Sequence, residues 1–232
     1  MNLFYHPEVH IGTSIEFDSS ESMHISKVLR KQSGDVLDIT DGCGHHAKAT
    51  ILVGKKSVSA TIDSCVSIAK RSEYLELCIA PTKNNERTEW FVEKAVEIGI
   101  EKITLIHCKH SERPHLKTER LRKVAISAMK QSLKFHLPEI SEIIPFAEWI
   151  KGNLPESRYI AHCQQTEKSL LRDALSGHKN ACIAIGPEGD FSSEEIQLAL
   201  QHKFIPVSLG HSRLRTETAA LAAVHTFELI HQ

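Results

Sequence analysis

From residue 74 onward, short apolar runs alternate with segments of helical periodicity, and this alternation restricts the fold more than any other feature of the chain. Apolar runs typical of strands occupy residues 74–80, 102–107, 159–161, 181–185 and 205–209. Segments with helical spacing occupy residues 87–98, 121–132, 170–175, 194–200 and 216–230. Alternating strands and helices predict an α/β domain, in which a mostly parallel sheet carries helices on its faces.

The first 70 residues have a different pattern, in which short alternating segments are separated by turn residues. Residues 35–40 and 47–53 are expected to be strands joined by a turn at Asp41-Gly42, and residues 57–62 alternate apolar and polar side chains. One short helix is expected at 22–29, and the polar stretch 70–73 is the expected linker. The sequence therefore predicts a β-rich domain at 1–70 and an α/β domain at 71–232.

Composition and the distribution of apolar residues narrow the class of protein. Hydrophobic residues make up 41% of the chain and charged residues 25%, so a packed core can form. No run of 18 apolar residues is present and the N-terminus lacks the pattern of a signal peptide, so no membrane span is expected. Six scattered cysteines are expected to be reduced and mostly buried, and these features together predict a cytoplasmic protein.

Residues 42–47 (GCGHHA) match the dinucleotide-binding pattern G-x-G-x-x-A. That pattern binds pyrophosphate only where a helix follows, and here the next residues alternate like a strand. A hairpin turn is therefore the favoured interpretation, and a nicotinamide-dependent oxidoreductase is a remote alternative. Cys43, His45 and His46 also suggest a metal site, but no second ligand pair stands at a usual spacing, so no metal is expected.

Residues 185–191 (IGPEGDF) leave an apolar run, turn through two glycines and a proline, and enter a helical segment. Ser192 and Glu195 have the spacing of a capping box. Loops at the carboxyl ends of parallel strands are where α/β proteins bind ligands, and glycine permits close approach of the backbone. An ordinary strand–helix turn explains these residues equally well, so both interpretations stay open at this point.

Residues 209–219 (LGHSRLRTETA) form a second loop between a strand and a helix. Thr216 is the candidate N-cap of the helix, and Glu217 suits its first turn. A favourable helix start alone explains Glu217. Arg213 and Arg215 beside a candidate ligand loop are harder to explain as solvated charges.

A basic stretch spans residues 102–134, with nine Lys or Arg and two Glu in a chain whose net charge is −1. A solvated helix face is the usual explanation for such residues, but the local excess is suited to the phosphates of RNA, which is the interpretation we favour. Near the expected N-terminal helix, His24, Lys27, Arg30 and Lys31 add positive or titratable groups to that surface.

In combination and in this order, several motifs resemble the SPOUT class of methyltransferases. The matching stretches are 24–30 (HISKVLR) with Gly34-Asp35, 93–100 (EKAVEIGI), Gln131-Ser132 with 138–140 (PEI), 185–189 (IGPEG), Leu209-Gly210, and 214–219 (LRTETA). Within that class the chain is most similar to the ribosomal RNA small subunit methyltransferase E family, which makes N3-methyluridine in 16S ribosomal RNA. The resemblance covers nearly the whole chain, and its last two motifs are specific in combination.

The resemblance implies a PUA-like β-barrel RNA-binding domain followed by a trefoil-knotted SPOUT α/β domain that forms a homodimer. It also implies S-adenosyl-L-methionine as cofactor, and 16S rRNA or the assembled small ribosomal subunit as partner. By position in the motifs, the expected cofactor-binding residues are Gly186, Pro187, Glu188, Gly189, Leu209, Gly210, Leu214, Arg215 and Thr216. The expected RNA-binding residues are His24, Lys27, Arg30, Lys94, Arg113, Lys130 and Lys134.

Two departures from the family pattern stand out. The family commonly has a second glycine after Gly-Pro-Glu-Gly, where this chain has Asp190. It commonly has Glu-Gln-Ser or Glu-Gln-Cys with an arginine two residues later, where this chain has Lys130-Gln131-Ser132 and then Lys134. The second change keeps positive charge but replaces the forked guanidinium by an ammonium group.

Methylation of uridine N3 requires that the base lose a proton, so a base or a group that stabilises the uridine anion is needed. Arg215 is the candidate stabiliser, Glu217 is a candidate to orient Arg215 or cap the helix, and Glu188 is a weaker candidate base. The target base has to be exposed or flipped into the pocket. The alternative function is RNA binding by the same fold without catalysis.

Overall fold

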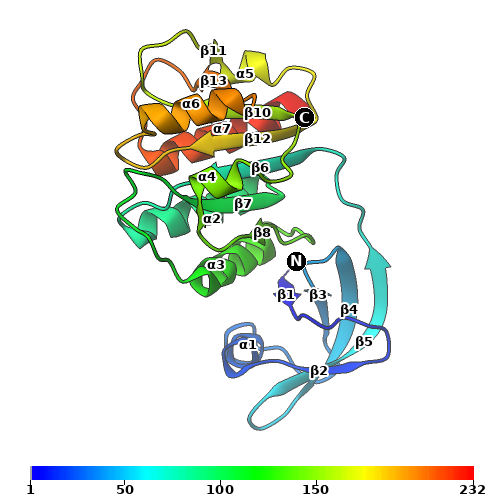
Figure 1. Cartoon of the computed structure of the whole chain (residues 1–232). Helices are drawn as coiled ribbons and strands as arrows, with labels where there is room; N and C mark the ends of the chain where they lie inside the picture. Colours follow the sequence, from blue (N-terminus) through cyan, green and yellow to red (C-terminus); the bar gives the residue numbers. More distant parts are fainter. Residues whose placement is uncertain (1) are drawn as a thin grey trace. The chain divides into compact units, whose positions relative to one another are not determined.

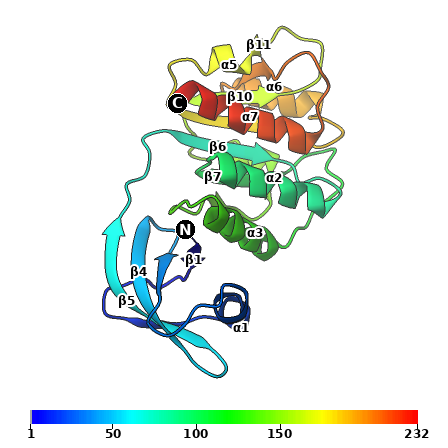
Figure 2. The same cartoon turned by 180° about the vertical axis from the view of Figure 1, so that it is seen from behind.

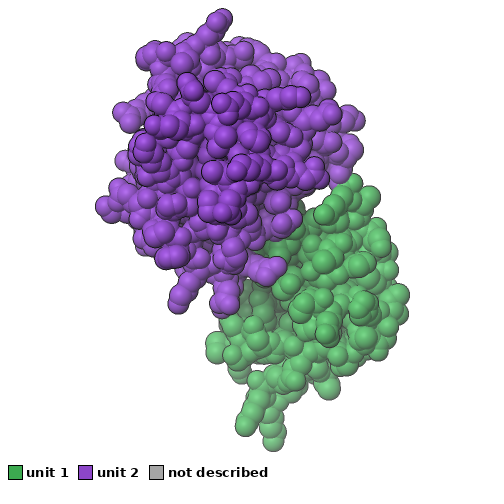
Figure 3. Space-filling view, viewed as in Figure 1, with its two compact units in different colours: residues 1–70, 126–137 green, residues 71–125, 138–232 purple. Residues whose placement is uncertain are grey.

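The computed structural model describes residues 2–232, which form two compact units (Figure 3). The first unit comprises Met1–Lys70 and Ile126–Leu137, and the second comprises Arg71–Ala125 and Pro138–Gln232. The sequence predicts residues 126–137 as part of the α/β domain, because their helical pattern gives no sign that they pack within the first unit.

The first unit is a five-stranded sheet in the order β1-β3-β4-β5-β2. Its strands are β1 (Leu3–Tyr5), β2 (Ser14–Glu16), β3 (Val36–Thr40), β4 (His45–Val53) and β5 (Val58–Ser67). The β3–β4 and β4–β5 pairs are antiparallel, with Thr40 opposite His46. The expected hairpin at residues 41–44 is therefore confirmed, and the dinucleotide-binding interpretation of this segment is wrong because a strand follows it.

A short helical segment covers residues that the sequence analysis expected to be helical. Helix α1 (Ser19–Met23) begins at Asp18, whose carboxylate accepts a hydrogen bond from the backbone N–H of Glu21 at 2.8 Å. It continues directly as a π-helix, η1 (His24–Val28), which places Ile25 in the core. Wider helical turns of this kind recur at functional sites.

Residues 132–137 complete the first unit by packing on the β3–β4 turn. The backbone N–H of Leu137 donates to the carbonyl of Gly42 at 2.7 Å, and that of Gly44 donates to the carbonyl of Phe135 at 2.8 Å. The Phe135 ring lies 4.7 Å from the ring of His46 between centroids. These contacts explain why a segment remote in sequence belongs to the β-rich unit.

The second unit is built on a sheet in the order β11-β13-β10-β12-β6-β7-β8, in which every pair of neighbours is parallel. Its strands are β6 (Tyr74–Ile79), β7 (Lys102–His107), β8 (Glu139–Ile140), β10 (Ser157–Ala161), β11 (Ser169–Leu170), β12 (Asn180–Ile185) and β13 (Ile205–Ser208), and β9 (Ile144–Pro145) pairs with β7 beside this path. The expected parallel sheet is confirmed.

Helices cover both faces of this sheet. Helices α4 (Phe146–Trp149) and α6 (Ser193–Gln201) lie in front of it in Figure 1. The reverse view in Figure 2 shows α2 (Asn85–Ile98) and α7 (Thr216–His231) in front. Helix α5 (Leu171–Ala174) follows β11, and α3 (Thr118–Gln131) begins in the second unit and ends in the first. One apolar cluster under α4 and α6 includes Phe146, Trp149 and Phe204.

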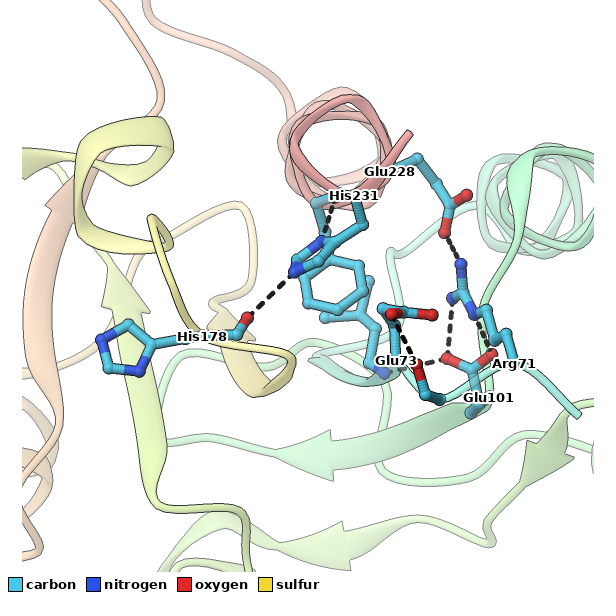
Figure 4. Close-up of polar contacts among 9 residues, drawn as sticks. Arg71, Glu73, Glu101, His178, Glu228 and His231 are labelled. Carbon is cyan, nitrogen blue, oxygen red and sulfur yellow. Dashed lines mark hydrogen bonds and ion pairs between the residues drawn. The ribbon is translucent and has the colours of Figure 1, made fainter.

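Arg71 ties the start of the second unit to two of its other segments (Figure 4). Its guanidinium binds both oxygens of Glu101, with Nε to Oε1 at 2.5 Å and Nη2 to Oε2 at 2.8 Å, and it also contacts the carboxylate of Glu228 on α7. Burial by itself would lower the pKa of Arg71, but the hydrogen bonds that it donates to Glu101 and Glu228 outweigh this effect and raise the pKa.

All six cysteines carry free thiols, and Cys78, Cys108 and Cys182 are buried as expected. Cys43 and Cys163 are exposed, because Cys43 lies in the connection between β3 and β4 and Cys163 in that between β10 and β11. The expectation that most thiols are buried is corrected accordingly. Within residues 2–232, no helix is long and apolar enough to cross a membrane.

Candidate functional site

Three loops leave the carboxyl ends of the neighbouring parallel strands β10, β12 and β13 and line one cleft of about 940 Å³. Residues from 161–168, 185–190 and 207–216 line it, together with Arg87 of α2 and Ala219 of α7. The register explains their meeting, since Ala161 lies beside both Ile185 and Val207 at the strand ends. The two loops singled out in the sequence thus share one cleft, as α/β sheets commonly arrange for ligands.

The loop after β12 is fixed mainly by its own packing. The expected capping box is confirmed: the hydroxyl of Ser192 accepts from the backbone N–H of Glu195, and the carboxylate of Glu195 accepts from that of Ser192. A Cβ at Gly186 would lie 3.0 Å from the Phe191 ring, and one at Gly189 would lie 2.9 Å from Cβ of His110. Packing inside the protein therefore favours glycine at both positions, whereas the expected reason was close approach of a ligand.

Asp190 stands where the family pattern has glycine, and its backbone takes the left-handed conformation with φ of 64°. Its side chain compensates for that strain with two hydrogen bonds of 2.8 Å. Oδ1 accepts from the backbone N–H of Phe191, and Oδ2 accepts from that of Cys163 in the loop after β10. Asp190 thereby connects two of the three loops that form the cleft.

The loop after β13 ends where α7 begins. The N-cap of α7 is Arg215, whose side chain makes no capping hydrogen bond, and Thr216 is the first helical residue. The expectation that Thr216 is the cap is wrong by one position. Arg213 and Arg215 are exposed residues that line the cleft, and within residues 2–232 neither guanidinium has a hydrogen bond or ion pair.

The two candidate acidic residues have protein partners. Glu217 is 7% exposed and lies 3.7 Å from Nε of Arg87 through Oε1, while its Oε2 has no hydrogen-bond partner among the described residues. Its cationic neighbour is thus Arg87 on α2 and not Arg215. Glu188 is exposed, and its Oε1 accepts from the backbone N–H of Lys83 at 2.9 Å, which anchors the loop before α2.

The third loop, residues 162–168 after β10, was not predicted as part of the site. Lys168 closes it, because its ammonium group donates to the carbonyls of His162 and Gln164, both at 2.8 Å. His162 is buried and lines the cleft. The strand predicted at 159–161 implies a third carboxyl end at the same edge of the parallel sheet. The loop residues after it match no motif, so the sequence did not indicate a role for them.

The expected cofactor-binding residues are mostly brought together. Gly186, Pro187, Glu188, Leu209, Gly210, Leu214, Arg215 and Thr216 all line the cleft, and Gly189 lies beside it against His110. Arg87, His162 and Lys168 are further lining residues that no motif indicated. The cleft therefore combines apolar side chains, loop backbone and several cationic groups.

The expected RNA-binding residues fall into both units. His24, Lys27 and Arg30 are exposed in the first unit, which also contains Lys130 and Lys134. Lys130 contacts the carboxylate of Glu21. In the second unit Lys94 is ion-paired with Glu93 and Glu97, at 2.7 and 2.9 Å, and Arg113 donates to the carbonyl of Lys83 at 2.6 Å. The basic stretch 102–134 is thus divided between the two units.

The Cys43, His45 and His46 cluster is not arranged to bind a metal ion. The His45 ring contacts Asp41 at 2.5 Å, and the His46 ring contacts Asp38 at 2.7 Å. Successive residues of a strand point to opposite faces, so the two rings diverge. Across residues 2–232, no group of three or more His, Cys, Asp or Glu side chains is placed to hold a metal.

Comparison with known proteins identifies relatives of both units. A family model described as an RNA methyltransferase domain matches residues 70–228, and one described as an RNA methyltransferase PUA domain matches residues 17–63. A ribosomal RNA small subunit methyltransferase E from Rickettsia conorii is 29% identical over 223 residues, covering 94% of this chain and 91% of its own.

Two solved structures extend the comparison to three dimensions. One from Porphyromonas gingivalis, described as a "probable rRNA-methyltransferase", is 41% identical, covers all of both chains and superposes with a TM-score of 0.92. A ribosomal RNA small subunit methyltransferase E from Neisseria gonorrhoeae, solved with bound S-adenosyl methionine, is 26% identical and superposes with a TM-score of 0.83. That alignment covers 97% of this chain and 95% of the other.

Proposed function

The chain belongs to the RNA methyltransferase family, and from this premise we propose that it transfers a methyl group from S-adenosyl-L-methionine to ribosomal RNA of the small subunit. The fold expected from the resemblance, a SPOUT-type α/β domain preceded by a PUA-like domain, is confirmed. The observation that carries the proposal is one cleft at the carboxyl ends of β10, β12 and β13. The three loops that follow these strands all line this cleft.

The cleft suits S-adenosylmethionine in size and chemistry. Its volume of about 940 Å³ lies within the range of small-molecule sites. Val207, Leu209 and Leu214 offer apolar contacts, and the loop backbone offers donors and acceptors. We assign cofactor binding to Gly186, Pro187, Glu188, Gly189, Leu209, Gly210, Leu214, Arg215 and Thr216. When bound, S-adenosylmethionine supplies a methyl group activated by its sulfonium.

We propose uridine N3 of 16S rRNA as the methyl acceptor, following the resemblance of the motifs. The N3 atom attacks effectively only as the uridine anion, so the site has to stabilise negative charge. Arg215 is suited to this role, since its guanidinium is exposed in the cleft without a protein partner among residues 2–232. The partner of Glu217 is Arg87, so we assign Glu217 to positioning α2 against α7. Glu188 remains the weaker candidate base because its carboxylate already holds the Lys83 amide.

The first unit is the proposed RNA-binding part, through His24, Lys27, Arg30, Lys130 and Lys134. His24 and Lys27 lie in the π-helix and Arg30 follows it, and all three are exposed, so they can meet phosphates. Lys94, Arg113 and Lys130 are weaker candidates because carboxylates or a carbonyl already bind them. We further propose that the protein acts as a homodimer in the cytoplasm on 16S rRNA or the assembled small subunit.

The decisive experiment measures methyl transfer to undermethylated small ribosomal subunits and to free 16S rRNA, with mass spectrometry of the product nucleosides. We expect N3-methyluridine with wild-type protein and a rate lower by about 100-fold in Arg215→Ala, the usual effect of removing one charge-stabilising group. Arg172→Ala is the matched control, since Arg172 is exposed outside the cleft and pairs with Asp173 on the same short helix. Wild-type rates in Arg215→Ala would remove Arg215 from the mechanism. Failure of the wild-type protein to bind S-adenosylmethionine in calorimetry would favour RNA binding without catalysis.

A further inference from the structure

His162 is a buried polar side chain that the protein leaves without a hydrogen-bond partner. It follows directly after β10, the strand between β12 and β13, and only 7% of its surface is exposed. Among residues 2–232, neither Nδ1 nor Nε2 of its ring has a partner. Buried polar groups are nearly always hydrogen-bonded, so this ring requires an explanation.

The backbone around His162 is fixed independently of the ring. The carbonyl of His162 accepts from Nζ of Lys168 at 2.8 Å, and the N–H of the next residue, Cys163, donates to Asp190 at 2.8 Å. These two anchors hold the ring at the wall of the cleft, which it lines. The ring position therefore follows from the contacts of its neighbours, and its own two nitrogens are buried at the cleft wall without a hydrogen bond among residues 2–232.

The environment of His162 also selects its protonation state. Burial lowers the pKa of His162, and the nearby Lys168 ammonium lowers it further, while Asp190 acts in the opposite direction. The ring is therefore neutral near pH 7 and offers one donor and one acceptor. A neutral ring is compatible with a cationic ligand in the same cleft, whereas an imidazolium would repel it.

We propose that the ring of His162 hydrogen-bonds to the adenosine part of S-adenosylmethionine, an inference that rests on the function proposed above. The adenine edge and the ribose hydroxyls are uncharged donors and acceptors that match a neutral imidazole. The amino-acid end and the sulfonium carry full charges: the carboxylate calls for a cationic partner such as an arginine of the cleft, and the two cationic groups call for oxygen acceptors. His162 thus recognises the part of the cofactor that stays the same before and after methyl transfer.

Calorimetry with the full-length protein tests this, using S-adenosylmethionine, S-adenosylhomocysteine and 5′-methylthioadenosine, which share only the thioadenosine. We expect His162→Leu to weaken binding of all three by about tenfold, the equivalent of one or two neutral hydrogen bonds. His162→Asn, which keeps a donor and an acceptor, recovers part of the affinity. His10→Leu is the control, because His10 is exposed in the first unit and outside the cleft.

Because an unpaired buried imidazole destabilises the unliganded protein, we expect His162→Leu to leave the melting temperature of that protein unchanged or higher. A purely structural role for His162 predicts the opposite, a lower melting temperature with unchanged affinity for the ligands. Wild-type affinity for all three ligands in His162→Leu would overturn the proposal, as would weakening that spares 5′-methylthioadenosine.

A second measurement is made on the wild-type protein. In ¹⁵N-histidine-labelled wild-type protein, the ring nitrogens of His162 should shift when S-adenosylmethionine is added, and unchanged shifts would overturn the proposal. His162→Asn identifies the signals. If wild-type protein binds none of the three ligands, the proposed function itself fails and this inference falls with it.

Discussion

Removing the guanidinium of Arg71 should destabilise the second unit measurably and leave the first unit unaffected. In Arg71→Ala, the carboxylates of Glu101 and Glu228 lose their shared cation, and these two side chains are only 19% and 12% exposed. Glu101 keeps the backbone N–H of Leu75 as a partner at 2.9 Å, whereas Glu228 loses its ion pair with Arg71. Two partly buried negative charges would then lie close together, and the Phe227 ring would lose a cation 5.8 Å from its centroid.

The magnitude lies between two limits. Breaking a fully buried ion pair by removing one partner costs about 3–5 kcal/mol, whereas an exposed pair contributes about 0–1 kcal/mol. The Arg71 side chain is 28% exposed, so a loss of about 2 kcal/mol in the free energy of unfolding is expected. For a urea slope of about 2 kcal/mol per molar, the unfolding midpoint would fall by about 1 M.

Tryptophan fluorescence is a suitable assay, because Trp90 and Trp149 are the two tryptophans of the chain and both lie in the second unit. Arg71→Lys should lie between wild type and Arg71→Ala, since it keeps the charge but loses the two-pronged contact with Glu101. Arg120→Ala is the control, as its pair with Glu89 is exposed on the arginine side and its midpoint should match wild type. A midpoint for Arg71→Ala equal to that control would refute the reasoning.

Three further predictions concern other parts of the chain. Burial would raise the pKa of Asp38, but hydrogen bonds from Lys48 and His46 outweigh it and lower the pKa. The stabilisation is therefore complete above about pH 4 and lost as the pH falls through the lowered pKa, so melting curves of wild type and Asp38→Asn should differ at pH 6 and converge at strongly acidic pH. Iodoacetamide at pH 8 should modify the exposed Cys163 but not Cys108, whose pKa is raised by burial. Peptide mass spectrometry would show which of the two thiols is modified, and S-adenosylmethionine should slow the labelling of Cys163. Gly99→Ala should lower the melting temperature, because φ is 142° and a Cβ would lie 3.1 Å from the Glu228 carboxylate; an unchanged value would contradict this account.

Periodicity in the sequence was sufficient to predict most elements of the second unit. Strand β7 has the predicted bounds 102–107, and α2 ends at Ile98 before Gly99 as expected, because long apolar patterns and a terminal glycine report on local structure. Strands β8 and β9 have two residues each and α4 has four, too short for any period to be visible.

Contacts between residues far apart in the chain could not be predicted from the sequence. No local pattern reveals that Arg87 meets Glu217, or that Asp190 reaches the backbone of Cys163, because these contacts depend on which strands are neighbours. Motifs located two of the three cleft loops. The third was missed because burial of His162 without a partner is a property of the folded protein and not of its sequence neighbours.

The first unit is encoded by two separate stretches of the chain, and this affects how the protein can be dissected. A fragment that stops at residue 70 would lack Phe135 against His46 and would leave the Gly42 carbonyl without the Leu137 amide. Such a fragment should expose apolar surface and aggregate. Exchange of the first unit between relatives would have to transplant both stretches together, including the last turns of α3.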